Sequence, residues 1–438
     1  MEPTILQRSD HCVSRKHISK NALQVLYRLN EKGYKGYLAG GCVRDLLLGK
    51  SPKDFDVATD ATPQQVKRCF RNCRLIGRRF RLAHVMFRDE IIEVATFRAP
   101  VEPMSDEEDE DHPSKEQKYV KLNEEGVVIR DNEYGTPEED AFRRDFTINA
   151  LFYDISDFSI IDYVGGLEDI KSKVVHCIGD PDLRYQEDPV RMIRAIRFAS
   201  TLDLVVEENT YQAILRERDH MTHASNARMY EEILKFFYSG AMEKAFAAWA
   251  ETKLLDVMFP GFTDWYRNTA TEDELAWHRK ALEQLDKWKA HDIKASPELA
   301  YALFLTPFIY HVRDELKAQG DLSPRAALME AVQQVQQVLM PRILIPKRTA
   351  FKVFDLLQAQ RRFTDRRSEQ RITRFLHRDY FRDALVLFKF DALATDRPQT
   401  DLIQAWTDDL KKAPPPQKRK ERPHHPKRKR RRRRRTHS

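Results

Sequence analysis

One short stretch, Leu38–Pro63, constrains the fold of this 438-residue chain more than any other. An apolar run is followed by two glycines, a helical segment and an extended segment that carries Asp54 and Asp56. Side chains two apart in a strand lie on the same face, so the two carboxylates are expected side by side and repel each other. Taken alone, such a pair is more often a solvated strand edge than a site. A divalent cation such as Mg²⁺, which prefers hard oxygen ligands, would neutralise it.

The residues before the two acids favour a site over a strand edge. Gly40 and Gly41 follow the apolar run and leave backbone N–H groups free to approach an anion at the start of a helix. Arg44 lies in the first turn of this helix, where a positive charge opposes the helix dipole. A phosphate ligand therefore explains Arg44 better than helix stabilisation does. Together with the acids, this arrangement predicts a nucleotidyl-transfer site.

The pattern G-G-x-V-R-D, then L-G, then D-x-D resembles the head of the class II nucleotidyltransferases. This family includes bacterial poly(A) polymerases and CCA-adding tRNA nucleotidyltransferases, and the resemblance is strong over residues 18–240. It implies two-metal catalysis with Mg²⁺, or Mn²⁺ as an alternative, in which Asp54 and Asp56 are catalytic metal ligands. It also implies that Gly40, Gly41 and Arg44 hold the triphosphate of the nucleotide.

A second match, residues 143–149, resembles the family motif R-R-D-F-T-x-N-A. The resemblance implies that Asp145 is the third catalytic metal ligand, next to the 3′-hydroxyl of the primer. It implies that Arg144 and Asn149 contact the sugar or phosphates of the incoming nucleotide. A surface charge cluster is the other interpretation of Arg144 and Asp145.

A third match begins at Glu187 and resembles the nucleobase-reading motif E-D-x-x-R of the family. Asp188 and Arg191 lie one helical turn apart, so an acceptor and a donor can meet the same base edge, here adenine. Arg194 and Arg197 follow at intervals of three residues and either contact the triphosphate or pack in the helix interface. In this interpretation the protein, rather than a template, selects the base.

Residues 75–85 distinguish between the two branches of the family. Their pattern, L-I-G-R-R-F-x-L-x-H-V, resembles the poly(A) polymerase branch rather than the CCA-adding branch.

The pattern D-x-x-G-G at residues 162–166 resembles a strand-to-turn junction of the family. Glu93 and Arg98 either line the cleft or form an ordinary ion pair at the end of a strand.

Local signals predict an α+β head, a small mixed sheet with helices, followed by an all-α neck and body. Ser19 caps a helix that ends near Gly33, and Thr62 with Pro63 begins another. We expect the following segments: a flexible N-terminus (1–17), the head (18–180) with an acidic loop (100–126), a neck that binds the base and RNA (181–250), an RNA-binding body (251–410) and a disordered basic tail (411–438).

The charge of the chain is unevenly distributed. The formal net charge is +7, but residues 411–438 alone carry +14, which leaves −7 for residues 1–410. Nine consecutive basic residues, 427–435, predict salt-dependent binding of polyanions with little sequence preference. Two segments of the body, 342–352 and 361–374, place basic and aromatic residues close together, as in RNA-binding surfaces, although a solvated helix face explains them equally well.

Composition limits the remaining possibilities. Five scattered cysteines suit a reducing cytoplasm, and Cys69 with Cys73 lacks a second pair for zinc. The sequence contains no run of about 18 apolar residues, so no membrane span is expected, and we expect no signal sequence in its first residues. We expect a cytoplasmic monomer with ATP and RNA 3′ ends as substrates, and RNA-decay or RNA-chaperone proteins as further partners.

The sequence thus predicts template-independent polyadenylation of RNA 3′ ends, with AMP taken from ATP and pyrophosphate released. The first alternative is a CCA-adding tRNA nucleotidyltransferase, which would have to accept CTP with the same residues. The second alternative is a non-catalytic RNA-binding scaffold that kept the fold. The three intact acids count against the scaffold, and the basic tail counts modestly against the CCA-adding enzyme.

Overall fold

The structure is a computed structural model that describes residues 2–77, 81–99, 134–320, 322–341, 345–365, 369–397 and 399–412. Five of the predicted features therefore lie wholly or partly outside the described residues: the acidic loop 100–126, the basic tail after Lys412, Arg78–Phe80 of the branch-specific motif, and parts of the basic segments 342–352 and 361–374. The contacts divide the chain into two compact units, residues 1–354 and residues 355–438. The boundaries expected at residues 180, 250 and 410 do not coincide with this division and stay predictions.

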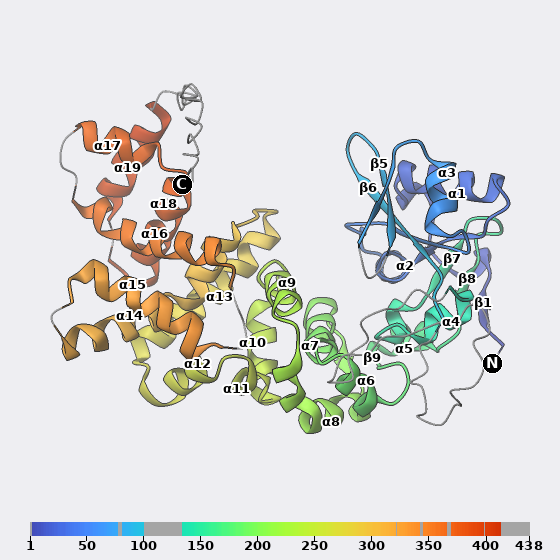
Figure 1. Cartoon of the computed structure of the whole chain (residues 1–438), viewed down its shortest axis with the longest axis horizontal. Coiled ribbons are helices and arrows are strands. Elements are labelled where there is room, and N and C mark those ends of the chain that lie inside the picture. Colours follow the sequence, from blue (N-terminus) through green and yellow to red (C-terminus); the bar gives the residue numbers. More distant parts are fainter. Residues whose placement is uncertain are drawn as a thin grey trace, which may run out of the picture. The chain divides into compact units, whose positions relative to one another are not determined.

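The N-terminal part of the first unit is built around a mixed sheet (Figure 1). Its strands in the described part of the chain are β1 (Thr4–Leu6), β2 (Gly36–Ala39), β3 (Asp56–Thr59), β4 (Cys73–Ile76), β5 (Leu82–Met86), β6 (Ile91–Thr96), β7 (Phe152–Asp154) and β8 (Ile160–Asp162). Their order is β1-β8-β7-β2-β3-β6-β5-β4, in which β3 and β6 are parallel and the other neighbours are antiparallel. The predicted α+β head is confirmed.

The centre of the sheet is buried on both faces. Leu38 and Val57 point to one face and pack with helices α1 (Lys20–Glu31), α2 (Gly41–Leu47) and α3 (Pro63–Cys69). Their chain neighbours Tyr37 and Ala58 point to the other face, where they pack with Phe97, Phe152 and α4 (Pro137–Phe142). Because alternate residues of β2 and β3 enter opposite cores, the register of the central strands is fixed. This rigidity matters because the candidate site is built on their ends.

Four strands meet at one end of the sheet. Ala39, the last residue of β2, lies opposite Phe152, the first residue of β7. Leu38 lies opposite Val57, which directly follows the start of β3 at Asp56. Asp56 in turn is in register with Glu93 of the parallel strand β6. The turn after β2, the start of β3 and the segment before β7 therefore converge although they are far apart in the sequence.

The N-terminal segment, predicted to be flexible, contains regular structure. Thr4–Leu6 forms the edge strand β1 and pairs with Ile160–Asp162 of β8, which lies more than 150 residues later. Val13 and Ile18 are buried in the core beneath α1. Short segments with one apolar face become ordered when the sheet edge supplies hydrogen bonds, and no local pattern in TIL signals this.

The predicted helix caps are confirmed. Ser19 accepts hydrogen bonds from the N–H groups at the start of α1, and Thr62 forms a capping box with Gln65. Asp180 caps α6 (Pro181–Glu187) in the same way. These signals are local, because an N-cap hydroxyl or carboxylate bonds backbone two or three residues ahead.

After α6 the described chain is almost entirely helical, as predicted, apart from the short strand β10 (Val205–Val206), which pairs in parallel with β9 (Val174–Val175). The other helices are α5 (Gly166–Ser172), α7 (Val190–Leu202), α8 (Glu208–Glu217), α9 (Asn226–Phe237), α10 (Met242–Glu251), α11 (Leu254–Met258), α12 (Pro260–Asp264), α13 (Glu272–Ala290), α14 (Pro297–Gln319), α15 (Pro324–Gln334), α16 (Lys347–Thr364), α17 (Glu369–Leu376), α18 (Phe381–Ala394) and α19 (Thr400–Lys412). Within the described ranges, no helix is both long and apolar enough to span a membrane.

Candidate active site

A cavity of about 400 Å³ lies at the end of the sheet where the four strands meet. Eight of the eleven predicted site residues line it, together with Phe198: Gly40, Gly41, Arg44, Asp56, Arg144, Asp145, Asn149 and Arg194. They come from the turn after β2, from β3, from the segment between α4 and β7, and from α7. Asp54, Asp188 and Arg191 do not belong to the lining.

Gly40 allows the chain to turn directly from β2 into α2. Its backbone has φ +75°, a conformation that residues with a Cβ rarely adopt. A Cβ at this position would lie 2.7 Å from Nη1 of Arg144 and 3.2 Å from the carbonyl oxygen of Asn149. The glycine therefore serves both the turn and the close packing of Arg144 against it.

Two arginines of the cavity are held in place by acids next to them. Nε and Nη2 of Arg44 donate to Asp45 at 2.9 and 2.7 Å, and Nη1 donates to the side-chain oxygen of Asn149. Nη2 of Arg144 donates to Asp140 at 2.9 Å, and its Nη1 donates to the carbonyl oxygen of Asn149 at 3.0 Å. Both guanidinium groups are thus oriented before any ligand arrives, which lowers the entropic cost of binding an anion.

Asp145 is the centre of a buried ionic network. Its Oδ2 accepts a hydrogen bond from Nε of Arg194 at 2.7 Å and lies 2.6 Å from Nη2 of the same side chain. Its Oδ1 accepts from the backbone N–H of Phe146 and from Nδ2 of Asn149. Burial alone would raise the pKa of Asp145, but Arg194 and these hydrogen bonds outweigh it and hold the pKa below its ordinary value.

This network continues from the head into the helices of the neck. Nη1 of Arg194 donates to Glu232 of α9 at 3.1 Å, and Arg197 donates to the second oxygen of Glu232 at 3.2 Å. Lys235 lies 2.6 Å from Glu232. Burial opposes ionisation of Glu232, yet Arg194 and Arg197 lower its pKa. Arg194 therefore bridges an acid of the head and an acid of the neck.

Asp145 is engaged by neighbouring groups in this structure, and its role as the third metal ligand stays a prediction. Both of its oxygens are engaged by Arg194, Asn149 and the backbone. In this structure the carboxylate of Asp145 compensates the charge of Arg194 and orients Arg194 and Asn149 through its hydrogen bonds.

Three further carboxylates, those of Asp54, Asp56 and Glu93, lie at or beside the start of β3, and that of Glu93 lies 3.5 Å from His84. β3 begins at Asp56, so Asp54 precedes the strand rather than sharing it, and its largely exposed carboxylate lies 3.5 Å from Lys53. Asp56 keeps access to solvent and has Glu93 as its register partner on β6. Partial desolvation and the carboxylates of Glu93 and Asp54 raise the pKa of Asp56 to about 6, although Arg144 opposes them. This crowding of negative charge is the condition that a bound cation relieves.

The residues predicted to read the base form a separate cluster. Asp188 follows α6 and is held by both terminal nitrogens of Arg228 at 2.7 Å each. Arg191 donates to Glu187 at 2.6 Å, whereas its Nε lies 4.0 Å from Asp188. The two side chains are neighbours, as the spacing predicted, but each has another partner in this structure.

Several residues of the site were not found from the sequence. Asp140 and Asp45, which orient the two arginines, belong to ordinary helical patterns, and Glu232 lies 38 residues from its partner Arg194. Phe198 has the guanidinium groups of Arg44 and Arg197 over its ring at 5.0 and 4.3 Å, although its position on an apolar helix face predicted only packing. Only Asp140, four residues before Arg144, has a spacing from which its contact could have been inferred.

The mixed sheet with its glycine turn, oriented arginines and crowded acids defines the chain as a nucleotidyltransferase. Three family models match it: "Poly A polymerase head domain" over residues 36–176, "Probable RNA and SrmB- binding site of polymerase A" over 203–266, and "Polymerase A arginine-rich C-terminus" over 320–437. Poly(A) polymerase I of Salmonella typhimurium is 39% identical over 403 residues, which are 92% of this chain and 84% of that protein. The chain belongs to the poly(A) polymerase I family.

Other relatives cover less of the chain. Poly(A) polymerase I of Haemophilus influenzae is 38% identical over 81% of this chain and 76% of that protein. The CCA-adding enzyme of Bacillus subtilis is 37% identical, but over only 55% of each chain. Among solved structures, the CCA-adding enzyme of Bacillus stearothermophilus in complex with CTP has a TM-score of 0.58 and 25% identity, covering 89% of this chain and 82% of that chain. The recognised family and fold are therefore confirmed.

Proposed function

We propose that the chain elongates RNA 3′ ends with AMP units from ATP, without a template, and releases pyrophosphate. The supporting observation is the cavity in which oriented arginines lie beside the crowded carboxylate of Asp56. Membership of the poly(A) polymerase I family supports AMP as the transferred unit, because the similarity extends over 92% of the chain.

The basic and acidic side chains of the cavity have different roles. Arg44 and Arg144 bind the triphosphate, since their guanidinium groups are held by Asp45 and Asp140 and still face the cavity. The Gly40 turn lets the backbone approach the phosphates without a Cβ in the way. Asn149 connects both arginines, so the three groups bind the nucleotide as one preorganised surface.

Asp54, Asp56 and Glu93 fit the requirements of a Mg²⁺ site. They offer hard carboxylate oxygens, and burial followed by the neighbouring carboxylates of Glu93 and Asp54 raises the pKa of Asp56. Mg²⁺, or Mn²⁺ in its place, supplies Lewis-acid activation of the 3′-hydroxyl and charge neutralisation of the leaving pyrophosphate. Glu93 thus takes the position that the sequence interpretation gave to Asp145, which instead keeps Arg194 and Asn149 in place.

Asp188 and Arg191 are proposed to recognise the base of the incoming nucleotide. Adenine offers an amino donor to Asp188 and a ring nitrogen acceptor to Arg191. Because Asp188 is held by Arg228, the base has to replace or share this exposed arginine. Recognition by two side chains rather than by a template would give strings of a single nucleotide.

A CCA-adding activity is the second candidate. It is favoured by the 37% identity to the Bacillus subtilis enzyme and by the likeness to a CCA-adding enzyme that holds CTP. That sequence similarity covers 55% of the chain, whereas the similarity to the poly(A) polymerases includes the C-terminal third. The extent of the similarity therefore favours polyadenylation.

The deciding experiment incubates the purified chain with a labelled RNA that has a free 3′-hydroxyl and with each nucleoside triphosphate separately. Long ladders with ATP alone are expected. Addition of only C, C and A to a trimmed tRNA would replace polyadenylation by the second candidate. If neither RNA is extended, and the Asp56→Asn variant behaves like the unchanged chain, the non-catalytic RNA-binding scaffold is the remaining interpretation.

The metal ligands are tested without activity, by binding of Mn²⁺ followed by electron paramagnetic resonance. Asp56→Asn and Glu93→Gln are expected to weaken Mn²⁺ binding at least tenfold. Asp145→Asn, shown by circular dichroism to be folded under the assay conditions, serves as the control, since it removes an equal charge from the cavity that Asp56 also lines. If Asp145→Asn weakens Mn²⁺ binding as much as Glu93→Gln does, Asp145 is a ligand and the assignment of Glu93 fails.

A further inference from the structure

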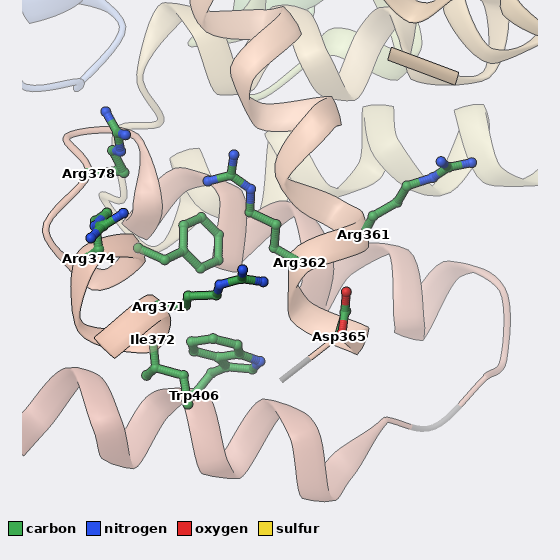
Figure 2. A pocket seen from close by; sticks show the side chains of 9 residues that line it. Arg361, Arg362, Asp365, Arg371, Ile372, Arg374, Arg378 and Trp406 are labelled. Carbon is green, nitrogen blue, oxygen red and sulfur yellow. The ribbon is translucent and has the colours of Figure 1, made fainter. Parts of the chain in front are cut away.

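A second cavity, of about 440 Å³, lies within the second unit (Figure 2). Two of its arginines come from the end of α16, two come from α17 and one follows α17: Arg361, Arg362, Arg371, Arg374 and Arg378. Among the described residues that line it, Asp365 is the only acid. In Figure 2, Arg362 and Arg371 extend between the two helices, and Arg361 points to the side opposite Arg374 and Arg378. We call these residues the arginine pocket.

The charges of the arginine pocket are not compensated within the described structure. All five arginines are exposed, and none forms a salt bridge with a residue that the structure describes. Arg371 and Arg374 are three residues apart on α17, a spacing at which like charges destabilise a helix. Five guanidinium groups around one cavity, with Asp365 as the one acid among the described lining residues, raise the local positive potential, and an anion bound among them lowers this repulsion.

The base of the arginine pocket is rigid. Phe363 of α16 packs with the rings of Phe375, Phe388 and Trp406 at centroid distances of 5.1, 4.9 and 5.5 Å. Nε1 of Trp406 donates to the carbonyl oxygen of Phe363 at 2.9 Å, which ties α19 to α16. Arg362 lies over the ring of Phe375 at 5.4 Å. The helices that carry the arginines are therefore fixed relative to one another by a common aromatic core.

We propose that the arginine pocket binds phosphate groups of a single-stranded RNA, at a position upstream of the 3′ end that reacts in the first unit. This inference rests on the proposed function, because it assigns a second contact to the same RNA substrate. Guanidinium groups bind phosphate oxygens with paired hydrogen bonds, and exposed guanidinium planes also accept stacked bases. The established similarity identifies an arginine-rich C-terminus but assigns no residue to a ligand.

The number and spread of the arginines favour a strand over a single small anion. One phosphate is satisfied by one or two guanidinium groups. Here five are distributed over two helices and the segment after them, and Figure 2 shows that they point in different directions. A polyanionic strand that passes along the surface can use several of them at once. Such contacts would strengthen binding without selecting a sequence.

The test compares two charge-matched double variants of the full chain. Arg371→Gln/Arg374→Gln removes two charges from the arginine pocket, and Arg382→Gln/Arg397→Gln removes two exposed charges from the same unit outside the pocket lining. Binding of labelled oligo(A) of 4 to 30 nucleotides with a blocked 3′ end is measured by fluorescence anisotropy over a range of salt concentrations. Blocked RNA makes this measurement independent of catalysis.

The pocket variant is expected to bind the longest RNA about tenfold more weakly and the shortest RNA as tightly as the unchanged chain does. The slope of log K against log salt should decrease in magnitude by about 1.4, which corresponds to two lost phosphate contacts on a single strand at about 0.7 each. The control variant should keep affinity and slope. With extendable RNA, the KM for long RNA should rise in the pocket variant while kcat and the KM for ATP stay unchanged.

The proposal is overturned if both double variants weaken long RNA equally, because the effect is then one of overall charge. It is also overturned if the pocket variant binds RNA of every length normally, which is expected if the pocket accepts an acidic protein. A third contradicting result is a variant that loses affinity for free ATP or pyrophosphate but keeps its affinity for RNA. Absence of AMP transfer by the unchanged chain would refute the proposed function, whereas the binding of blocked RNA would still decide the role of the pocket.

Discussion

The two arginine-rich cavities of this protein differ in how their charges are compensated. In the first unit, Arg144 and Arg194 are each hydrogen-bonded to an acid, Asp140 and Asp145. In the second unit, the five arginines of the arginine pocket form no salt bridge within the described residues. The first cavity is thus a fixed arrangement of donors with a nearly balanced charge, and the second is a concentration of free positive charge.

This difference corresponds to two kinds of recognition. Arginines fixed by acids can bind only an anion that fits their directions, as a reaction at one phosphorus atom requires. Arginines without acidic partners attract any polyanion, in a way that depends strongly on salt. If both proposals hold, one enzyme combines selective binding of the nucleotide with unselective binding of the strand, and mutations in the two cavities should have opposite kinetic signatures.

The largest difference is expected in the chemical step. Asp56→Asn should lower kcat by at least about 10³-fold, since it removes a preorganised charge next to the reacting groups. Arg371→Gln/Arg374→Gln should leave kcat within about twofold. Single-turnover extension at saturating RNA measures both. Asp89→Asn, on the turn between β5 and β6, is the control for loss of an acid from the head. A residual kcat above one tenth in Asp56→Asn would remove Asp56 from the catalytic groups.

The second expected difference is in the stability lost when a buried or a more exposed ion pair is broken. The pairs Arg194–Asp145 and Arg216–Asp182 both have a nitrogen–oxygen distance of 2.6 Å, but the first is more buried. Asp145→Asn leaves Arg194 without full compensation and should lower the free energy of unfolding by roughly 3–5 kcal/mol. Asp182→Asn should cost less than about 1 kcal/mol. Urea denaturation provides both values. Equal, small losses would mean that the network at Asp145 does not hold head and neck together.

The parts of the site that the sequence predicts correctly are those built from neighbouring residues. Ser19 and Thr62 bond backbone groups two or three positions ahead, so their residue types identify helix starts. The turn at Gly40 follows from two glycines between an apolar run and a helix. In each case the interaction lies within one turn of the chain, where sequence spacing and distance in space agree.

The parts that sequence reasoning missed depend on partners far along the chain. Asp145 meets Arg194 after 49 residues, and a motif cannot show that an acid is neutralised from another helix. Asp56 meets Glu93 because β3 and β6 are parallel neighbours in the sheet, an order that no local pattern encodes. The strand β1 was taken for a flexible terminus for the same reason. The motif thus located the cavity, while the role of each acid required the fold.

A third difference concerns the backbone of the first cavity. Gly40→Ala places a Cβ 2.7 Å from Nη1 of Arg144 and should lower kcat/KM for ATP about tenfold, since small displacements in such a site have large kinetic effects. Gly49→Ala is the matched control, because Gly49 has φ +68° and no atom within 4 Å of the added Cβ. It imposes a similar backbone strain without touching the cavity. If both variants lose the same activity, the strain and not the position of Arg144 is responsible.

The smallest expected effect is a gain in stability when arginines of the arginine pocket are replaced, whereas replacement of Asp145 in the first cavity should lower stability. Without RNA, Arg371→Gln/Arg374→Gln should raise the free energy of unfolding of the second unit by about 0.2–0.5 kcal/mol at low salt, because like charges three apart on α17 repel each other. At about 1 M salt the gain should vanish, since screening then acts over roughly 3 Å. Trp406, the one tryptophan of residues 355–438, reports unfolding of this unit by its fluorescence. A loss of stability instead would mean that these arginines already have compensating partners, and the contrast between the two cavities would no longer hold.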